Sequence, residues 1–317
     1  MAHPQLKLKT VTRTQGANTA LKDGSVSPRQ ASLEFVEIPV LVHAFRRMVR
    51  QLEFDVCEMA ATTYLCAKRF GVGFTAIPVF LVRGFHHGAV MTHPTAGVEG
   101  PKDLEGRRVG VNRGYTVTTG VWARSILARE HGVALDRVTW VLSGDEHVEQ
   151  YRPPANVVPV DPGADLVDLL AAGELAAVVG AGIAGPRITP LIHDPTAAAI
   201  EAVRRRGFFP FNHLVVVRDD LLAAYPGLAA DLFEAFAAAK TRYVTEIEKF
   251  DALELSGADR VNRQVMAITG TDPLPYGIEP NRDILEELID AAVAQHILDR
   301  RPTLDDLFAA ETRDLVA

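Results

Sequence analysis

Two long apolar segments with the pattern of β-strands constrain the fold of this chain more than any other feature. They cover residues 74–92 (FTAIPVFLVRGFHHGAVMT) and 212–220 (NHLVVVRDD). Strand-sized and helix-sized segments alternate between and around them, which is typical of a parallel or mixed α/β sheet. Because the two long segments border one compact β/α region, we expect a second domain to be inserted into the first.

The other elements follow from hydrophobic spacing and from Gly and Pro positions. Further strands are predicted at 6–13, 32–40, 53–60, 108–112, 137–143 and 176–182, and helices at 40–51, 61–71, 116–131, 165–175, 226–250 and from 281 onward. The sequence therefore predicts an α/β fold of two lobes, each a mixed sheet flanked by helices. We expect residues 1–90 and 210–317 to form the first lobe and 91–209 the second, with crossings near 84–93 and 208–214. A ligand would lie in the cleft between the lobes.

Composition excludes several classes of protein. The 317 residues are 48% hydrophobic and 23% charged, which is ordinary for a folded chain and unlike a disordered one. The net charge of −7 argues against a nucleic-acid partner, because phosphate neutralisation needs basic residues. The longest apolar runs are too short to cross a bilayer, and the start, MAHPQLKLKTVTR, lacks the apolar core of a signal peptide. Cys57 and Cys66 fit no metal spacing. We therefore expect a cytoplasmic protein that has no membrane partner.

Several motifs in order along the chain resemble the 4,5-dihydroxyphthalate decarboxylase family. They are RGFHHGAV, GPKDLEGRRVGV, TGVWARSILAREHGV, VTWVLSGDEH, FFPFNHLVVVRDDLL, TDPLPYGIEPNRDILEELIDAA and PTLDDLFAAET. The resemblance implies the two-lobed fold of periplasmic solute-binding proteins of type II. It also implies cofactor-free removal of one carboxylate from a dihydroxylated phthalate. Three segments depart from the family's commoner patterns: the two histidines at 86–87, the loop RGYTVTT and the run FPFNH. The resemblance therefore supports the fold of this chain more strongly than its substrate.

This chemistry requires an acid that protonates the ring carbon and cations that hold the remaining carboxylate. Arg83 is expected to be a carboxylate clamp and His87 the proton donor, with His86 as a rival. The alternative is that adjacent histidines near a hinge are structural. His213 matches the family's histidine after a Phe-Pro pair and is a third candidate. Arg13, which ends the first strand, is a second candidate clamp, although many such arginines only cover a surface.

The segment from 112 to 119 joins a predicted strand to a predicted helix and is dense in hydrogen-bond donors. The candidate substrate-binding residues in it are Asn112, Arg113, Tyr115, Thr116, Thr118 and Thr119. Free N–H groups at a helix start favour a carboxylate, although simple capping by Thr116 or Thr118 needs no ligand. A weaker cluster, Thr62 and Thr63, follows Glu58. Glu58 either accepts a catechol hydroxyl or is a solvated loop residue.

Asp145, Glu146 and His147 follow another strand, and Glu146 and His147 are further candidates for substrate binding. With His87 and His213 they invite a metal site, but no common ligand spacing is present, so we expect no metal and no cofactor. The expected partner is a small aromatic carboxylate, and a homo-oligomer is compatible with the sequence. The alternative function is a non-catalytic solute-binding protein for a small carboxylate, against which the lack of a signal peptide argues.

Overall fold

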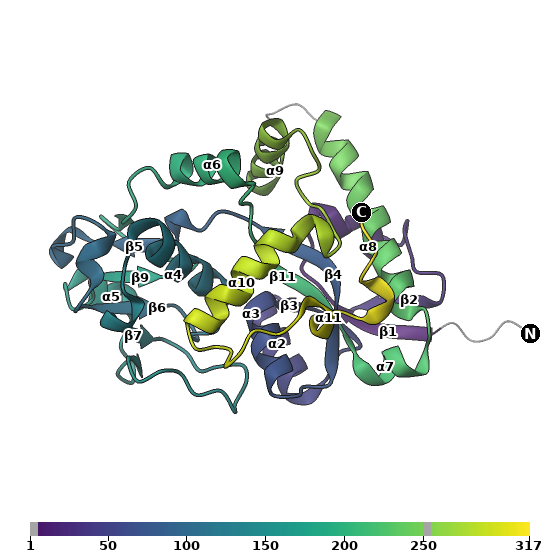
Figure 1. Cartoon of the computed structure of the whole chain (residues 1–317), viewed down its shortest axis with the longest axis horizontal. Coiled ribbons are helices and arrows are strands. Elements are labelled where there is room, and N and C mark those ends of the chain that lie inside the picture. The colour runs from purple at the N-terminus through teal and green to yellow at the C-terminus, as the bar shows by residue number, and fades with distance from the viewer. Residues whose placement is uncertain (1–5, 250–254) are drawn as a thin grey trace, which may run out of the picture. The chain divides into compact units, whose positions relative to one another are not determined.

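The computed structural model describes residues 6–249 and 255–317, which form two compact units (Figure 1). The first unit contains the chain up to Gly84, Phe209–Glu286 and Pro302–Ala317, and the second contains Phe85–Phe208 and Glu287–Arg301. The chain thus passes into the second unit between residues 84 and 85 and returns between 208 and 209. The predicted cleft between the lobes stays a prediction.

The first unit contains a mixed sheet of five strands in the order β2-β1-β3-β11-β4. Its strands are β1 (Leu6–Val11), β2 (Ala31–Phe35), β3 (Val56–Ala60), β4 (Phe74–Arg83) and β11 (Phe211–Arg218). β1 is parallel to β2 and β3, whereas β11 is antiparallel to β3 and β4. Its helices are α1 (Thr19–Lys22), α2 (Leu41–Gln51), α3 (Ala61–Arg69), α7 (Asp219–Ala224), α8 (Leu228–Lys249), α9 (Gly257–Thr269) and α11 (Leu304–Leu307).

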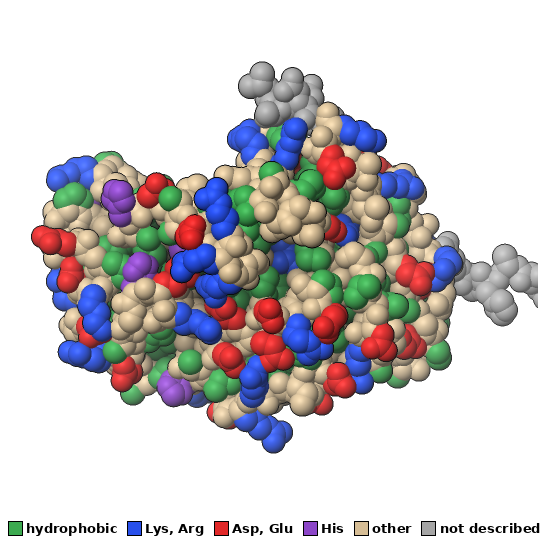
Figure 2. Space-filling model, turned by 45° about the horizontal axis from the view of Figure 1, so that its top comes forward, with side chains coloured by type: hydrophobic (Ala, Val, Ile, Leu, Met, Phe, Trp, Pro, Cys, Tyr) green, Lys and Arg blue, Asp and Glu red, His purple; other side chains and the backbone are tan. Residues whose placement is uncertain are grey.

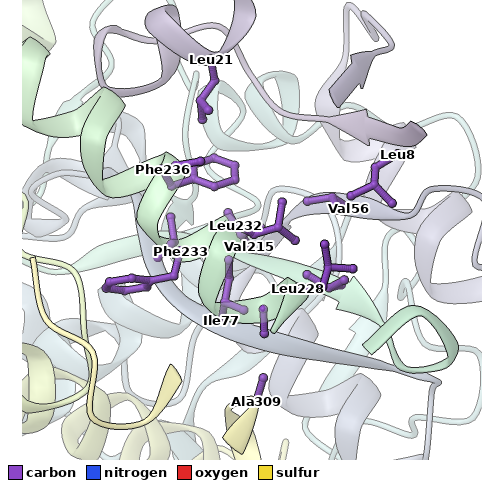
Figure 3. Close-up of a cluster of buried hydrophobic side chains, with 14 of the residues drawn as sticks. Leu8, Leu21, Val56, Ile77, Val215, Leu228, Leu232, Phe233, Phe236 and Ala309 are labelled. Atoms are coloured by element: carbon purple, nitrogen blue, oxygen red, sulfur yellow. The ribbon is translucent and has the colours of Figure 1, made fainter. Parts of the chain in front are cut away.

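Helix α8 supplies much of the core of this unit (Figure 3). The sequence places apolar residues of α8 on one stripe, and all are buried: Leu228, Leu232, Phe236, Tyr243 and Ile247. The first three pack against strand residues that include Val56, Ile77 and Val215. A fully buried Leu or Phe side chain contributes about 1.5–3 kcal/mol relative to an exposed one. This packing holds the sheet whose strand ends carry the candidate site. Phe250, the predicted end of this helix, lies outside the described residues.

The second unit contains a mixed sheet of six strands in the order β10-β5-β9-β6-β7-β8. Its strands are β5 (Val90–Thr92), β6 (Arg108–Val111), β7 (Thr139–Leu142), β8 (Val157–Pro159), β9 (Ala177–Val179) and β10 (Thr189–Pro190). Its helices are α4 (Thr118–His131), α5 (Leu166–Ala171) and α6 (Pro195–Arg206). Helix α10 (Arg282–Ala294) begins in the first unit and continues into the second.

Two predictions about organisation need correction. The expected single strand over 74–92 is two strands, because β4 ends at Arg83, next to Val82 with its left-handed φ of 55°, and the chain turns through residues 87–89 before β5. The segment 287–301, assigned by pattern to the first lobe, belongs to the second unit. There the buried Gln295 accepts a hydrogen bond from Arg124 Nε and donates one to the carbonyl of Val121, both on α4. Helix α9 was not predicted.

Surface charge is mixed. Figure 2 shows basic and acidic side chains interspersed over the face that it draws, in keeping with the net charge of −7. That face lacks the extended basic surface with which proteins bind nucleic-acid phosphates. In the part of the chain that the structure describes, none of the helices combines the length and the apolar character needed to span a bilayer.

Candidate functional site

The first unit brings together three of the predicted site residues: Arg13 in the loop after β1, Glu58 within β3 and His213 near the start of β11. Antiparallel pairing sets His213 opposite Ala60 and Val215 opposite Glu58. One oxygen of the fully buried Glu58 carboxylate lies 2.5 Å from His213 Nδ1. The other oxygen accepts a hydrogen bond from the backbone N–H of Arg13 at 2.7 Å. Glu58 therefore lies in a strand and is not a solvated loop residue.

This geometry leaves His213 equipped for proton transfer. The Phe45 ring packs edge-on against the imidazole, with ring centroids 5.1 Å apart, and helps to fix its plane. Because Nδ1 faces Glu58, Nε2 is the ring nitrogen that remains to meet a ligand, and 13% of the side chain is exposed. A carboxylate behind a histidine orients the ring and stabilises its protonated form. The pair can therefore act as a general acid or base.

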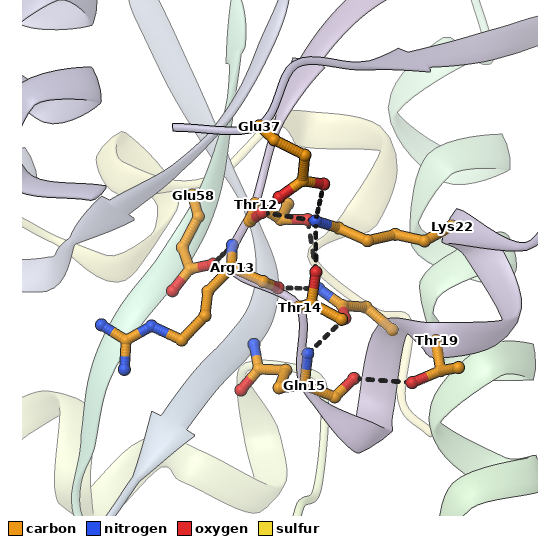
Figure 4. A network of polar contacts seen from close by, with 9 residues as sticks. Thr12, Arg13, Thr14, Gln15, Thr19, Lys22, Glu37 and Glu58 are labelled. Atoms are coloured by element: carbon orange, nitrogen blue, oxygen red, sulfur yellow. Dashed lines mark hydrogen bonds and ion pairs between the residues drawn. The ribbon is translucent and has the colours of Figure 1, made fainter. Parts of the chain in front are cut away.

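The loop after β1 presents Arg13 beside Glu58 (Figure 4). Lys22 donates hydrogen bonds to the carbonyl of Thr12 at 2.8 Å and to Thr14 Oγ1 at 2.9 Å, and it pairs with Glu37. These bonds fix the backbone of the loop. The side chain of Arg13 is exposed and forms no ion pair with any residue from 6–249 or 255–317. The guanidinium of Arg13 is thus available to bind an anion beside the Glu58–His213 pair.

Arg83, the first expected clamp, forms several hydrogen bonds within the first unit. Its guanidinium donates to the carbonyls of Phe209 at 2.7 Å and Pro275 at 3.2 Å and to Asn281 Oδ1. Burial lowers the pKa of Arg83 to about 10. The terminal nitrogens therefore tie β4 to two other segments of the first unit, and only Nε is without a hydrogen-bond partner among the described residues.

His86 and His87 belong to the second unit, whereas Glu58 and His213 belong to the first. His87, the favoured proton donor, is only 1% exposed, and its Nε2 lies 3.1 Å from Glu130. Glu130 also pairs with Arg206 at 3.0 Å. Burial, with a smaller contribution from His87, lowers the pKa of His86 to about 3, so His86 is neutral. Among the described residues, His86 Nε2 and His87 Nδ1 are buried without a hydrogen-bond partner, and the proton-donor role of either histidine stays a prediction.

The loop between β6 and α4 is already occupied by a carboxylate of the chain itself. Glu146 accepts hydrogen bonds from the backbone N–H groups of Tyr115 and Thr116 and from the Thr116 hydroxyl at 2.6 Å. Burial raises the pKa of Glu146. The predicted anion-binding donors thus hold Glu146, which itself was expected to bind substrate. Neither Thr116 nor Thr118 is the cap of α4, because Val117 occupies that position without a side-chain hydrogen bond.

The other predicted residues are distributed around these two places. Asn112 donates to the carbonyl of Ala181 at 2.9 Å, and the exposed Arg113 has a left-handed φ of 78°. Thr62 and Thr63 lie in the first turn of α3 and Thr118 and Thr119 in that of α4, whereas the buried His147 lies in the loop between β7 and β8. Within residues 6–249 and 255–317 we find no group of three or more His, Cys, Asp or Glu side chains that could hold a metal ion.

Sequence reasoning missed two polar residues near the Glu58–His213 pair. Tyr276 is fully buried, its hydroxyl lacks a hydrogen-bond partner in the described chain, and it interacts electrostatically with Arg83 and Glu58. Gln15 lies two residues after Arg13, and its side-chain nitrogen is also buried without a partner there. The sequence signal that could have identified Gln15 is that it lies two residues from Arg13 in the loop that follows β1.

Comparisons with known proteins support a relation to two decarboxylases and to one fold. A protein named 4,5-dihydroxyphthalate decarboxylase from Comamonas testosteroni is 30% identical over 280 residues, which cover 83% of this chain and 84% of that protein. One of the same name from Pseudomonas putida is 32% identical over 174 residues, 50% of this chain and 67% of that protein. No family model matches the chain.

Solved structures with low identity match the fold alone. The periplasmic aliphatic sulphonate binding protein SsuA from Escherichia coli is 9% identical, with 96% of this chain and 98% of that chain covered and a TM-score of 0.53. The desulfurization enzyme DSZB is 14% identical, with 96% of each chain covered and a TM-score of 0.54. The predicted periplasmic-binding-protein-like α/β fold is thereby confirmed. On the identity and coverage shared with the Comamonas protein, this chain belongs to the 4,5-dihydroxyphthalate decarboxylase family.

Proposed function

We propose that this protein is a carboxy-lyase that decarboxylates a hydroxylated aromatic dicarboxylic acid such as 4,5-dihydroxyphthalate. The products are a dihydroxybenzoate and carbon dioxide. The observation that carries the proposal is the pairing of the buried Glu58 with His213 in a chain of this family. Such a pair supplies what the reaction needs from a protein, a positioned acid that can deliver one proton.

The reaction balances with one proton delivered and one taken back. Protonated His213 gives the proton on Nε2 to the ring carbon that carries the departing carboxylate. A hydroxyl para to that carbon pushes electron density into the ring and stabilises the resulting cation. The bond from the ring to the carboxylate carbon then breaks, its electron pair restores aromaticity, and carbon dioxide leaves. Water returns a proton to His213.

Two neighbours assist His213 in this scheme. Glu58 holds Nδ1 at 2.5 Å and stabilises the positive charge of the ring before transfer. Arg13 offers its exposed guanidinium to a substrate carboxylate, an interaction for which Arg is suited by its two parallel N–H groups. The structure thus favours His213 as donor over His87, whose ring is buried against Glu130.

The direct test is to incubate the purified protein with a panel of hydroxylated and unhydroxylated aromatic acids and to measure carbon dioxide release. We expect release from 4,5-dihydroxyphthalate and none from phthalate, which lacks the activating hydroxyls. His213→Gln should lower kcat at least about 100-fold, in the range of general-acid contributions. His87→Gln is the comparison variant, because it also removes a histidine paired with a glutamate. Full activity in His213→Gln with loss in His87→Gln would assign the proton donor to the second unit.

A further inference from the structure

A pocket of about 300 Å³ opens in the first unit beside the Glu58–His213 pair. The loop after β1, the end of β4, and helices α8 and α9 line it. Arg13 connects the two places, because its backbone N–H binds Glu58 while the residue lines the pocket. The volume is at the lower end of the range for small-molecule sites, ~300–1,000 Å³. Phe80 and Leu81, both in β4, add apolar surface to the lining.

The polar groups of this pocket that lack partners are donors. Gln15 Nε2 and Arg83 Nε are buried and form no hydrogen bond within residues 6–249 and 255–317. A buried amide or guanidinium N–H without an acceptor destabilises the fold. In Figure 4 the side chains of Arg13 and Gln15 extend to the same side of their loop, away from the pair of Lys22 and Glu37. A ligand that carries several hydrogen-bond acceptors would give these unpaired donors partners.

The charge of the pocket has the sign that an anion needs. Its charged lining residues are two arginines, Arg13 and Arg83, and one aspartate, Asp259, which gives a formal charge of +1. The carboxylate of Asp259 is engaged elsewhere, since it accepts hydrogen bonds from the Tyr243 hydroxyl and from the backbone N–H of Ser256. Its oxygens are therefore held by the chain itself, and the two arginines leave the lining with a net positive charge for a ligand carboxylate.

We propose that this pocket binds the carboxylate that the substrate retains, and that Gln15 is a specificity-determining residue which donates a hydrogen bond to it. The inference rests on the proposed function for the identity of that ligand, an aromatic 1,2-dicarboxylate. One carboxylate lies against Gln15 and Arg83 Nε, and Arg13 stands between the pocket and Glu58. The site thereby selects dicarboxylates over phenols that carry no carboxylate.

The test measures binding and needs no turnover. Phthalate serves as an unreactive probe, and its affinity is measured by titration calorimetry for the wild type, Gln15→Glu and Thr19→Ala. Gln15→Glu keeps the size of the side chain but replaces its donor by a negative charge. The loop itself should persist, because Gln15 is held by backbone bonds to Asn18 and by the Thr19 hydroxyl. Thr19→Ala is the matched control, since it perturbs that loop without changing the pocket lining.

We expect Gln15→Glu to weaken phthalate binding at least tenfold and Thr19→Ala to change it less than about twofold. Wild-type protein that does not bind phthalate, a folded Gln15→Glu variant that binds it normally, or an equal loss in Thr19→Ala would each overturn the inference. The proposed function fails separately, if the wild type releases no carbon dioxide from dihydroxyphthalates. Phthalate binding that still depends on Gln15 would then leave the carboxylate site in place.

Discussion

Replacing Glu58 by Gln tests the core of the mechanism. The substitution exchanges one carboxylate oxygen for an NH₂ group and removes the negative charge, with almost no change of shape. The Gln oxygen can still accept from the Arg13 N–H, but its NH₂ group then faces His213 Nδ1. Nδ1 can then form a hydrogen bond with the NH₂ group only as an acceptor, which requires the neutral ring. In the protonated ring, the hydrogen on Nδ1 would face the NH₂ group, so two donors would oppose each other. The lost contact is a hydrogen bond between charged groups, worth about 1.5–3 kcal/mol. We therefore expect kcat to fall about 10- to 150-fold, at about 1.4 kcal/mol per tenfold change.

The assay is carbon dioxide release from 4,5-dihydroxyphthalate, with kcat and KM measured separately across pH. Glu58→Asp is the control, because it keeps the charge and withdraws it from His213 by one methylene group. Thermal unfolding of each variant separates a loss of the acid from a loss of the fold. The reasoning is refuted if well-folded Glu58→Gln keeps the wild-type kcat and pH profile, since His213 would then act without its carboxylate.

Three further predictions concern buried ionisable side chains. Arg83→Met should lower the free energy of unfolding by about 3 kcal/mol in urea titrations, because the bonds to the Phe209 and Pro275 carbonyls are lost. Burial raises the pKa of Glu146 above its ordinary 4.5, so its contribution to stability is present below that pH and is lost as pH rises. Wild type should thus lose stability relative to Glu146→Gln as pH rises above about 4.5, as measured by urea titrations across pH. Burial lowers the pKa of His86 from 6.5 to about 3, so the unfolded chain takes up a proton there at a higher pH than the folded protein. The free energy of unfolding should therefore fall by up to about 1.4 kcal/mol per pH unit as the pH drops below 6.5. His86→Phe should flatten this slope in acid unfolding.

The sequence predicted much of the fold because the relevant signals are local. The stripe on α8 and the apolar strands β3 and β11 are periodic patterns within one segment, and burial follows them. The membership of segment 287–301 in the second unit could not be read in this way. It depends on a hydrogen bond between Gln295 and Arg124, which are 171 residues apart.

The site was harder to predict for the same reason. Residue types identified Arg13, Glu58 and His213, but spacing along the chain could not show that Glu58 pairs with a histidine 155 residues later. Spacing also could not show that the donors of Tyr115 and Thr116 are taken by Glu146. A cluster of donors in sequence predicts that an acceptor is present, without saying whether it belongs to a ligand or to the chain.

Two histidine–glutamate pairs in this protein show why access decides between structural and chemical roles. His87 with Glu130 and His213 with Glu58 have similar chemistry, at 3.1 Å and 2.5 Å. Glu130, however, is shared with Arg206, and the His87 side chain is 1% exposed. The His213 side chain is 13% exposed, and its glutamate is otherwise bound only to a backbone N–H among the described residues. A proton donor must meet its substrate atom at hydrogen-bond distance. The greater exposure of the His213 side chain is therefore the reason why we propose His213, and not His87, as the donor.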